Sequence, residues 1–265
     1  MNAIGYTRMP GFRRLYALLA ILCVAAPFRA RAAGTDRFPL CRELAGGREL
    51  PLPTGCGVSL YYQTQDYDLT RLDASIPGVS LADTAGVTIE NRTMEANAKL
   101  DLWLLPFLNL YALAGYIEGE TSVDLGLLAG ELDVDYTGIV YGGGGVLAAG
   151  TDRFFAALNT TFVLTKLDTS DSSLQSWIIQ PQLGTRTPRA AFWAGAMYQQ
   201  TEESHEGRIA LPGFGTVDYD VEFEQKEPWS YLIGTQLTPG KAWAFDFELG
   251  FGTRQHVLTG ATRRF

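Results

Sequence analysis

The chain has 265 residues, a formal net charge of −8 and a mean hydropathy of +0.01. Nucleic acid is excluded as a partner, because phosphate binding requires a basic surface and no cluster of Lys and Arg follows the first 33 residues. After those residues no clean apolar run reaches about 18 positions, which excludes a membrane-spanning helix there.

The first 33 residues have the pattern of a targeting segment. Three arginines precede an apolar run at 15–27, and small residues follow as far as Ala33. This pattern predicts a secretory signal peptide over residues 1–33. The segment holds five arginines and no acid, so its removal changes the net charge from −8 to −8 − 5 = −13. The mature protein is therefore predicted to be exported and strongly acidic.

Residues 34–56 form an irregular stretch that contains Pro, Gly and the pair Cys41 and Cys56. We expect a periplasmic N-terminal lead here, joined by a Cys41–Cys56 disulfide, because an exported protein meets an oxidising compartment. Closing a loop of this length would stabilise the fold by about 3 kcal/mol in the chain-entropy model. A metal site would need further ligands nearby, so neither a metal nor a cofactor is predicted.

Apolar and polar residues alternate from residue 57 onward in segments bounded by turn residues, which is the pattern of β-strands. The segments predict ten strands, the eighth of them with a bend at Pro228, at 58–66, 94–105, 108–120, 134–149, 153–166, 174–185, 190–200, 217–237, 242–251 and 254–265.

The ninth segment, residues 242–251, alternates without an error. One face of this strand would carry large apolar side chains, Trp243, Phe245, Phe247, Leu249 and Phe251, and the other would carry Asp246 and Glu248. A soluble sheet would bury the aromatic face, whereas a barrel in lipid turns it outward and keeps the polar face in its lumen. A bilayer admits only helices and closed barrels, so this alternation favours a barrel.

The lengths of the connections give an independent test. Short links at 106–107, 150–152, 186–188 and 238–240 alternate with links that include the long ones at 67–93, 121–133 and 201–216. A barrel whose two ends lie in the periplasm has short periplasmic turns and longer outer loops. The chain is therefore predicted to form a ten-stranded antiparallel up-and-down transmembrane β-barrel over residues 57–265, with eight or twelve strands as alternatives. A closed barrel has no free edge, so a monomer is expected.

The end of the chain, with Gly260 and the terminal Phe265, resembles the closing strand of Gram-negative outer-membrane proteins, whose assembly signal ends in an aromatic residue. Arg263 departs from that pattern, although its long stem can snorkel to the headgroup region. Residues 102–111 are similar to a segment of a family of uncharacterised proteobacterial outer-membrane barrels. The resemblance implies the outer membrane as location, its lipid and lipopolysaccharide as surroundings and the barrel-assembly machinery as a partner, but no activity.

A network of charged side chains is predicted to fill the lumen. Its members are Lys99, Asp101, Glu118, Glu120, Asp246, Glu248, Arg254 and His256, with Gln180 and Gln182 as further inward polar residues. A turn centred on Gly252 would bring Glu248 and His256 face to face.

A carboxylate that orients an imidazole is half of a hydrolase site. Ten strands is also the size of the omptin proteases, but the Asp-x-His motif that this resemblance would require is absent. We therefore prefer an internal charge network that fills a narrow barrel, and expect no enzyme activity.

Three functional classes follow. The first is a structural or narrow-channel role, leaning towards cations and small solutes, since ten strands leave at most a constricted passage. The second is a surface adhesin or interaction protein that uses acidic outer loops. The third is an outer-membrane hydrolase acting on lipid or peptide.

Overall fold

In a computed structural model the chain is described over residues 37–74, 88–124, 131–168, 173–202, 205–211, 215–225 and 227–265. This part contains one short 3-10 helix, η2 (Arg42–Ala45), and twelve strands. The strands are β1 (Thr54–Ala74), β2 (Thr88–Leu105), β3 (Leu108–Asp124), β4 (Glu131–Gly150), β5 (Phe154–Leu167), β6 (Ser173–Arg186), β7 (Ala190–Glu202), β8 (His205–Leu211), β9 (Gly215–Gln225), β10 (Trp229–Gly240), β11 (Trp243–Phe251) and β12 (Arg254–Arg264). No helix among the described residues is long and apolar enough to cross a bilayer.

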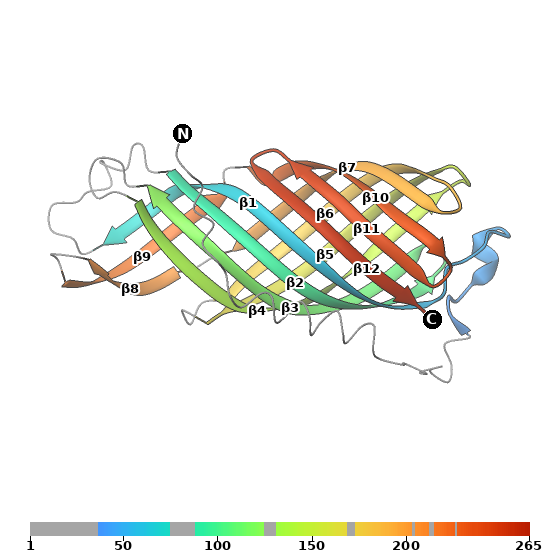
Figure 1. Cartoon of the computed structure of the whole chain (residues 1–265), viewed down its shortest axis with the longest axis horizontal. Coiled ribbons are helices and arrows are strands. Elements are labelled where there is room, and N and C mark those ends of the chain that lie inside the picture. The colour runs from blue at the N-terminus through green and yellow to red at the C-terminus, as the bar shows by residue number, and fades with distance from the viewer. Residues whose placement is uncertain are drawn as a thin grey trace.

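Ten of the strands close into one antiparallel barrel (Figure 1). The order around the wall is β1 to β7, then β10, β11 and β12, and β12 pairs back onto β1 from Gly55–Arg264 to Gln65–Arg254. Closure satisfies the backbone hydrogen bonds of the first and last strands, as a bilayer requires. The predicted ten-stranded up-and-down barrel is therefore confirmed, and the alternatives of eight and twelve barrel strands are wrong.

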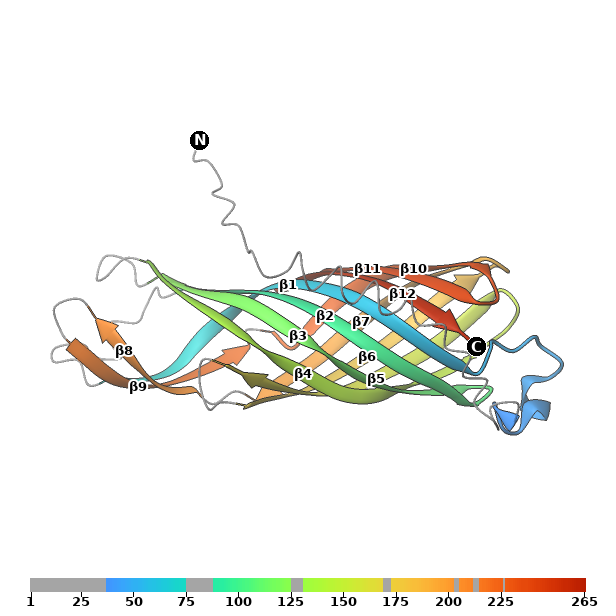
Figure 2. The ribbon, with the colours of Figure 1, turned by 60° about the horizontal axis from the view of Figure 1, so that its bottom comes forward.

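The hairpin β8–β9 lies outside the barrel wall. Strand β9 pairs with the C-terminal part of β1, from Tyr67–Gln225 to Ala74–Tyr219, and β8 pairs with β9. Figures 1 and 2 show the hairpin beyond the barrel, at the end opposite to the C-terminus. The predicted single strand 217–237 is thus wrong, and so is the predicted loop 201–216. Alternation is the same in a hairpin and in a wall, and Pro228, which has no N–H to donate, lies between β9 and β10.

The two ends of the barrel differ. Short turns at 106–107, 151–153, 187–189 and 241–242 lie at the end that holds the C-terminus, which we call the terminal end (Figure 1). The opposite end, called the loop end, carries the longer connections and the extended parts of β1 to β4. These four strands have 17–21 residues. These strands are longer than predicted. Their residues continue to alternate between the inner and outer faces beyond the point where the outer face becomes charged.

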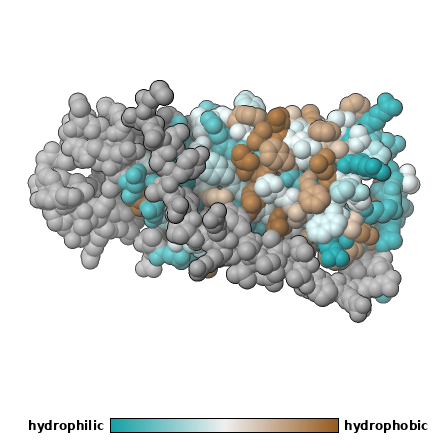
Figure 3. All heavy atoms as spheres, viewed as in Figure 1, coloured by the Kyte–Doolittle hydropathy of each residue, from teal (hydrophilic) through white to brown (hydrophobic). Residues whose placement is uncertain are grey.

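Large apolar side chains are exposed on the outer face of all ten barrel strands. Leu183 is 71% exposed, Tyr231 70% and Leu100 65%. The apolar stretch covers 94–104 on β2 and 108–116 on β3, and about ten residues of tilted strand span about 25 Å, the height of a lipid-facing band. Figure 3 shows apolar residues gathered in the middle of the barrel and polar ones at the terminal end. Soluble monomers do not expose a patch of this size, so lipid covers this band.

The cysteines of the N-terminal lead are free thiols, so the predicted Cys41–Cys56 disulfide is wrong. The Leu40 N–H, next to Cys41, donates to the Leu104 carbonyl at 2.9 Å, whereas Cys56 pairs with Leu100. Four residues of strand separate these anchors by about 13 Å, and a disulfide needs Cα atoms within about 7 Å. The barrel begins at Thr54, three residues before the predicted boundary at 57. The predicted signal peptide, residues 1–33, lies outside the described residues.

Candidate functional site in the barrel lumen

The inner face of the barrel carries the polar half of the strand alternation. On β11, Asp246 and Glu248 point inward, and Phe245 and Phe247 point outward. Polar and charged side chains are buried in the lumen, among them Gln63, Gln65, Thr93, Asn97, Asp101, Asn109, Thr161, Thr165, Ser230, Glu248, Arg254, His256 and Thr262. The interior therefore has the polarity of a lumen and not of a soluble core.

Inward glycines accommodate the rings of the lumen. A Cβ added to Gly234 would overlap the Trp193 ring, and one added to Gly250 would overlap the His256 ring. A glycine in a strand lets a neighbouring group approach the backbone closely. These rings therefore pack against the wall, which lets a narrow barrel hold both rings and polar groups.

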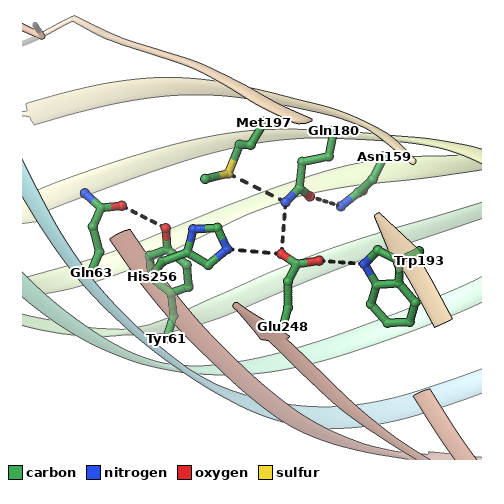
Figure 4. Close-up of polar contacts among 8 residues, drawn as sticks. All are labelled: Tyr61, Gln63, Asn159, Gln180, Trp193, Met197, Glu248 and His256. Carbon is green, nitrogen blue, oxygen red and sulfur yellow. Dashed lines mark hydrogen bonds and ion pairs between the residues drawn. The ribbon is translucent and has the colours of Figure 1, made fainter. Parts of the chain in front are cut away.

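Glu248 is the centre of a hydrogen-bonded network (Figure 4). Its Oε2 accepts from the indole N–H of Trp193 at 3.0 Å. Its Oε1 lies 3.4 Å from Gln180 Nε2, which donates, and 3.2 Å from His256 Nε2. Glu248 is on β11 and Gln180 is on β6, and β7 and β10 lie between these strands in the wall. The network therefore bridges the lumen from one part of the wall to another.

The network continues along β5 and β3 on one side. Asn159 Nδ2 donates to Gln180 Oε1 at 2.7 Å, and Tyr111 OH donates to Asn159 Oδ1 at 2.8 Å. The phenol oxygen of Tyr111 also lies 2.5 Å from Thr161 Oγ1. Side chains from β3, β5, β6, β11 and β12 are thus joined in one polar layer.

On the other side the network passes to β1. The Tyr61 ring lies 5.3 Å from the His256 ring, centroid to centroid, and Tyr61 OH donates to Gln63 at 2.8 Å. Gln63 donates to Gln65 Oε1 at 3.1 Å, and the same oxygen accepts from Arg254 Nε at 3.0 Å. The seam between β1 and β12 is therefore lined by the same kind of polar contacts as the rest of the lumen.

A second cluster lies nearer the terminal end. Asp101 Oδ1 accepts from Arg264 Nη1 and from Asn109 Nδ2, both at 2.9 Å. Lys99 Nζ lies 5.6 Å from the centre of the Tyr111 ring, a cation–π contact. Asp246 accepts from Gln236 at 2.7 Å. Carboxylates and cations alternate here, so the lumen is charged on both sides of the Glu248 network.

Six residues of the predicted charge network face the lumen, namely Lys99, Asp101, Asp246, Glu248, Arg254 and His256. Glu248 and His256 are in contact, but diagonally, because His256 pairs with Gly250 and Glu248 pairs with Leu258. The predicted face-to-face register is therefore wrong by one pair, and the predicted Gln180 joins the contact. Seven members of the network were not predicted, namely Tyr61, Gln63, Gln65, Tyr111, Asn159, Thr161 and Trp193. For Trp193 the sequence did offer a signal. Adjacent residues of a strand point to opposite faces, so an outward Phe192 implies an inward Trp193.

Glu118 and Glu120 depart from the prediction. They pair with Met94 and Arg92 on the outer face of β2, just beyond the apolar band, where Arg92 and Glu90 form an ion pair at 2.9 Å. Their assignment to the lumen is corrected to the outer face near the loop end. The inner face of β3 includes the apolar Leu113 and Ile117, whereas the two glutamates lie on its outer face. Assigning the more polar side of β3 to the lumen therefore placed Glu118 and Glu120 on the wrong face.

The Glu248–His256 pair has two of the three groups of a hydrolase site, and the described part of the chain places no third group on His256. Both side chains are almost fully buried, and His256 Nδ1 has no hydrogen-bond partner in the described part of the chain. Within the described residues, no serine, threonine or cysteine is hydrogen-bonded to this imidazole. No group of three or more possible metal ligands is found among the described residues either.

The predicted assembly residues lie on the closing strand β12 and directly after its end. Gly260 faces the lumen between Ser59 and Asp246, and the Phe265 N–H donates to the Thr54 carbonyl at 2.9 Å. Arg263 points outward, and its guanidinium lies 5.8 Å from the Trp243 ring and 5.1 Å from the Phe265 ring. Aromatic and basic side chains of this kind mark a membrane interface.

The chain matches no family model and no curated protein. It is similar to several solved barrel structures. The β domain of the Bordetella autotransporter BrkA is 11% identical, with 80% of this chain and 99% of that one covered and a TM-score of 0.45. The translocator domain of the autotransporter NalP from Neisseria meningitidis is 12% identical, with 96% and 98% covered and a TM-score of 0.40. The outer-membrane protein OprG from Pseudomonas aeruginosa is 15% identical, with 82% and 99% covered and a TM-score of 0.40.

Proposed function

We propose that the chain is an integral protein of the Gram-negative outer membrane and forms a narrow passage for small, polar, preferentially cationic solutes. The observation that carries this proposal is a closed wall with lipid-facing apolar residues outside and a connected polar layer inside. Hydrogen-bonding groups in a lumen can replace part of the hydration shell of a solute, which an apolar filling cannot do.

The same wall supports the proposed location and orientation. Closed barrels with an even number of strands, short turns at one end and long loops at the other are typical of outer membranes, where the short turns face the periplasm. The terminal end, with both ends of the barrel chain, is accordingly the periplasmic one. The lipid-facing band supports contact with lipid and lipopolysaccharide, and the aromatic end of β12 supports insertion by the barrel-assembly machinery. Closure between β1 and β12 supports a monomer.

Charge in the lumen supports the preference for cations. Among the described residues, four buried or half-buried carboxylates face inward, on Glu95, Asp101, Asp246 and Glu248, against three buried or half-buried permanent cations, on Lys99, Arg254 and Arg264. Arg186 is on the inner register too, but it is exposed at the terminal end of β6. The outer face near the loop end includes five carboxylates, on Glu90, Glu118, Glu120, Asp133 and Asp135, and two cations, on Arg92 and Lys166. An excess of carboxylates around the loop end raises the local concentration of cations.

The test is single-channel recording in planar bilayers. The wild-type protein should give small discrete steps with cation preference, since the Glu248 network narrows the lumen. Glu248→Gln keeps the size of the side chain but removes its charge, and should lower the cation-to-anion permeability ratio. Lys166→Gln is the matched control, because Lys166 lies on the outer face of β5, opposite Ile139. Silent membranes would refute the passage and favour a structural or adhesive role.

A further inference from the structure

The N-terminal lead forms a flap at the terminal end of the barrel. Both ends of the flap, residues 41–52, are attached to the end of β2. Leu40 N–H donates to the Leu104 carbonyl at 2.9 Å, and the Pro53 carbonyl accepts from the Trp103 N–H at 2.8 Å. The two anchors are neighbouring residues of one strand, so the flap is attached to the wall at one place.

The middle of the flap reaches two distant turns. Arg48 Nη1 donates to the Gly150 carbonyl at 2.5 Å, at the β4–β5 turn, and Glu49 forms an ion pair with Lys241, at the β10–β11 turn. Between these turns the wall contains β5, β6, β7 and β10. Consecutive Cα atoms are only about 3.8 Å apart, so adjacent residues that contact both turns must lie over the opening between them. Figures 1 and 2 both show this segment beyond the terminal end of the barrel.

The flap is also connected to the charges inside. Arg264 Nη1 lies 3.4 Å from the Leu52 carbonyl, to which it donates, and 2.9 Å from Asp101 Oδ1 in the lumen. The same guanidinium thus contacts the flap and the terminal charge cluster. Both far contacts of the flap, in contrast, are exposed, and exposed ion pairs are weak.

We infer that the flap is a lid on the terminal mouth of the lumen, attached at β2 and held shut by Arg48 on the β4–β5 turn and Glu49 on the β10–β11 turn. Because the far contacts are exposed, the lid opens transiently and the attachment at β2 persists. The role of the lid in transport rests on the proposed function. Whether the lid covers the lumen can be tested without any transport measurement.

The first test measures access to the lumen. In a background with Cys41→Ser and Cys56→Ser, Ala244→Cys places a reporter thiol on the inner face of β11, where Ala244 is buried opposite Thr262. A small charged maleimide should label it slowly. Lys241→Glu should speed labelling by about fivefold, the effect of losing an exposed ion pair of the stronger kind. Arg189→Cys, at the exposed β6–β7 turn, is the control thiol and should label at one rate in both backgrounds.

A charge swap makes this test specific. Glu49→Lys combined with Lys241→Glu restores the attraction with reversed signs and should return the labelling of Ala244→Cys to the slow rate. Equal labelling rates in the wild-type, Lys241→Glu and swapped backgrounds would overturn the lid.

Conductance then separates the lid from the passage. Glu49→Cys and Lys241→Cys, joined by a short bis-maleimide in the background with Cys41→Ser and Cys56→Ser, should abolish the steps that the protein shows before cross-linking. Unchanged steps after cross-linking would overturn the lid. If labelling follows the predictions and every variant is silent in the bilayer, the lid stands and the proposed passage fails.

Discussion

The outer and inner faces of β11 show how one strand builds two surfaces. Phe245 and Phe247 face lipid, and Asp246 and Glu248, their neighbours in sequence, face the lumen. On β3 the same alternation continues past Tyr116, but the outer face there becomes acidic at Glu118. Which side chains a position tolerates depends on whether it faces lipid or the lumen and on how deep it lies in the bilayer. The bilayer covers only about ten residues of each strand.

The largest effect is expected from a charge in the centre of the outer face. Phe247→Arg should lower the free energy of unfolding by about 2–4 kcal/mol, since it places a guanidinium in lipid near the middle of the band. Urea titration of the protein in vesicles measures this. Glu120→Arg is the matched control, because the same residue type beyond the band should cost about 1 kcal/mol or less. Equal costs at both positions would contradict the comparison.

The inner face should respond to the opposite change, the loss of a charge. Asp101→Ala leaves Arg264 and Asn109 without their shared acceptor and should cost about 2 kcal/mol, because groups left buried and unpaired lose their solvation. Asp101→Asn retains one acceptor oxygen and should cost less. The same urea titration ranks the two variants, and a neutral Asp101→Ala would show that water replaces the carboxylate.

A smaller effect tests the packing of rings on glycines. Gly234→Ala should cost about 1–2 kcal/mol, because the added methyl group displaces the Trp193 ring from the wall. Gly240→Ala serves as the control, since nothing lies within 4 Å of a Cβ at that position. Tryptophan fluorescence during unfolding reports both the stability and the environment of the ring. Identical unfolding curves would mean that the ring has room elsewhere.

The smallest effect on stability, and a pH dependence, are expected at the flap. Lys241→Ala should leave the unfolding curve unchanged, since the Lys241–Glu49 pair is exposed. The hydrogen bond from Lys241 lowers the pKa of the Glu49 carboxyl from its ordinary 4.5, and the carboxylate raises the pKa of Lys241.

A group with a lowered folded-state pKa stabilises the folded contact above its ordinary pKa and loses that contribution as pH falls through the lowered value. The flap should therefore stay shut above about pH 4.5 and open below the lowered pKa of Glu49. The ratio of labelling at Ala244→Cys to labelling at Arg189→Cys measures this. The ratio should rise at acid pH, and Lys241→Ala should raise it at neutral pH.

Alternation of large apolar and acidic residues at 242–251 was sufficient to assign both faces of β11. The turn near Gly252 was sufficient to bring Glu248 near His256, although the exact register differs, since His256 pairs with Gly250. The alternation of β3 was not sufficient for Glu118 and Glu120, because polarity beyond the bilayer no longer tells the outside from the inside. The hairpin β8–β9 shows the same limit, since its pattern is that of a wall strand.

By itself the sequence determined the class of fold, the number of barrel strands and the polar nature of the lumen, since strand period and lipid solvation act along a single strand. Only the tertiary structure decided which partners meet across the barrel, such as Gln180 with Glu248, and that the lead reaches two turns far apart in sequence. Closure of the sheet brings these groups together, and no local pattern encodes a distance across a cylinder.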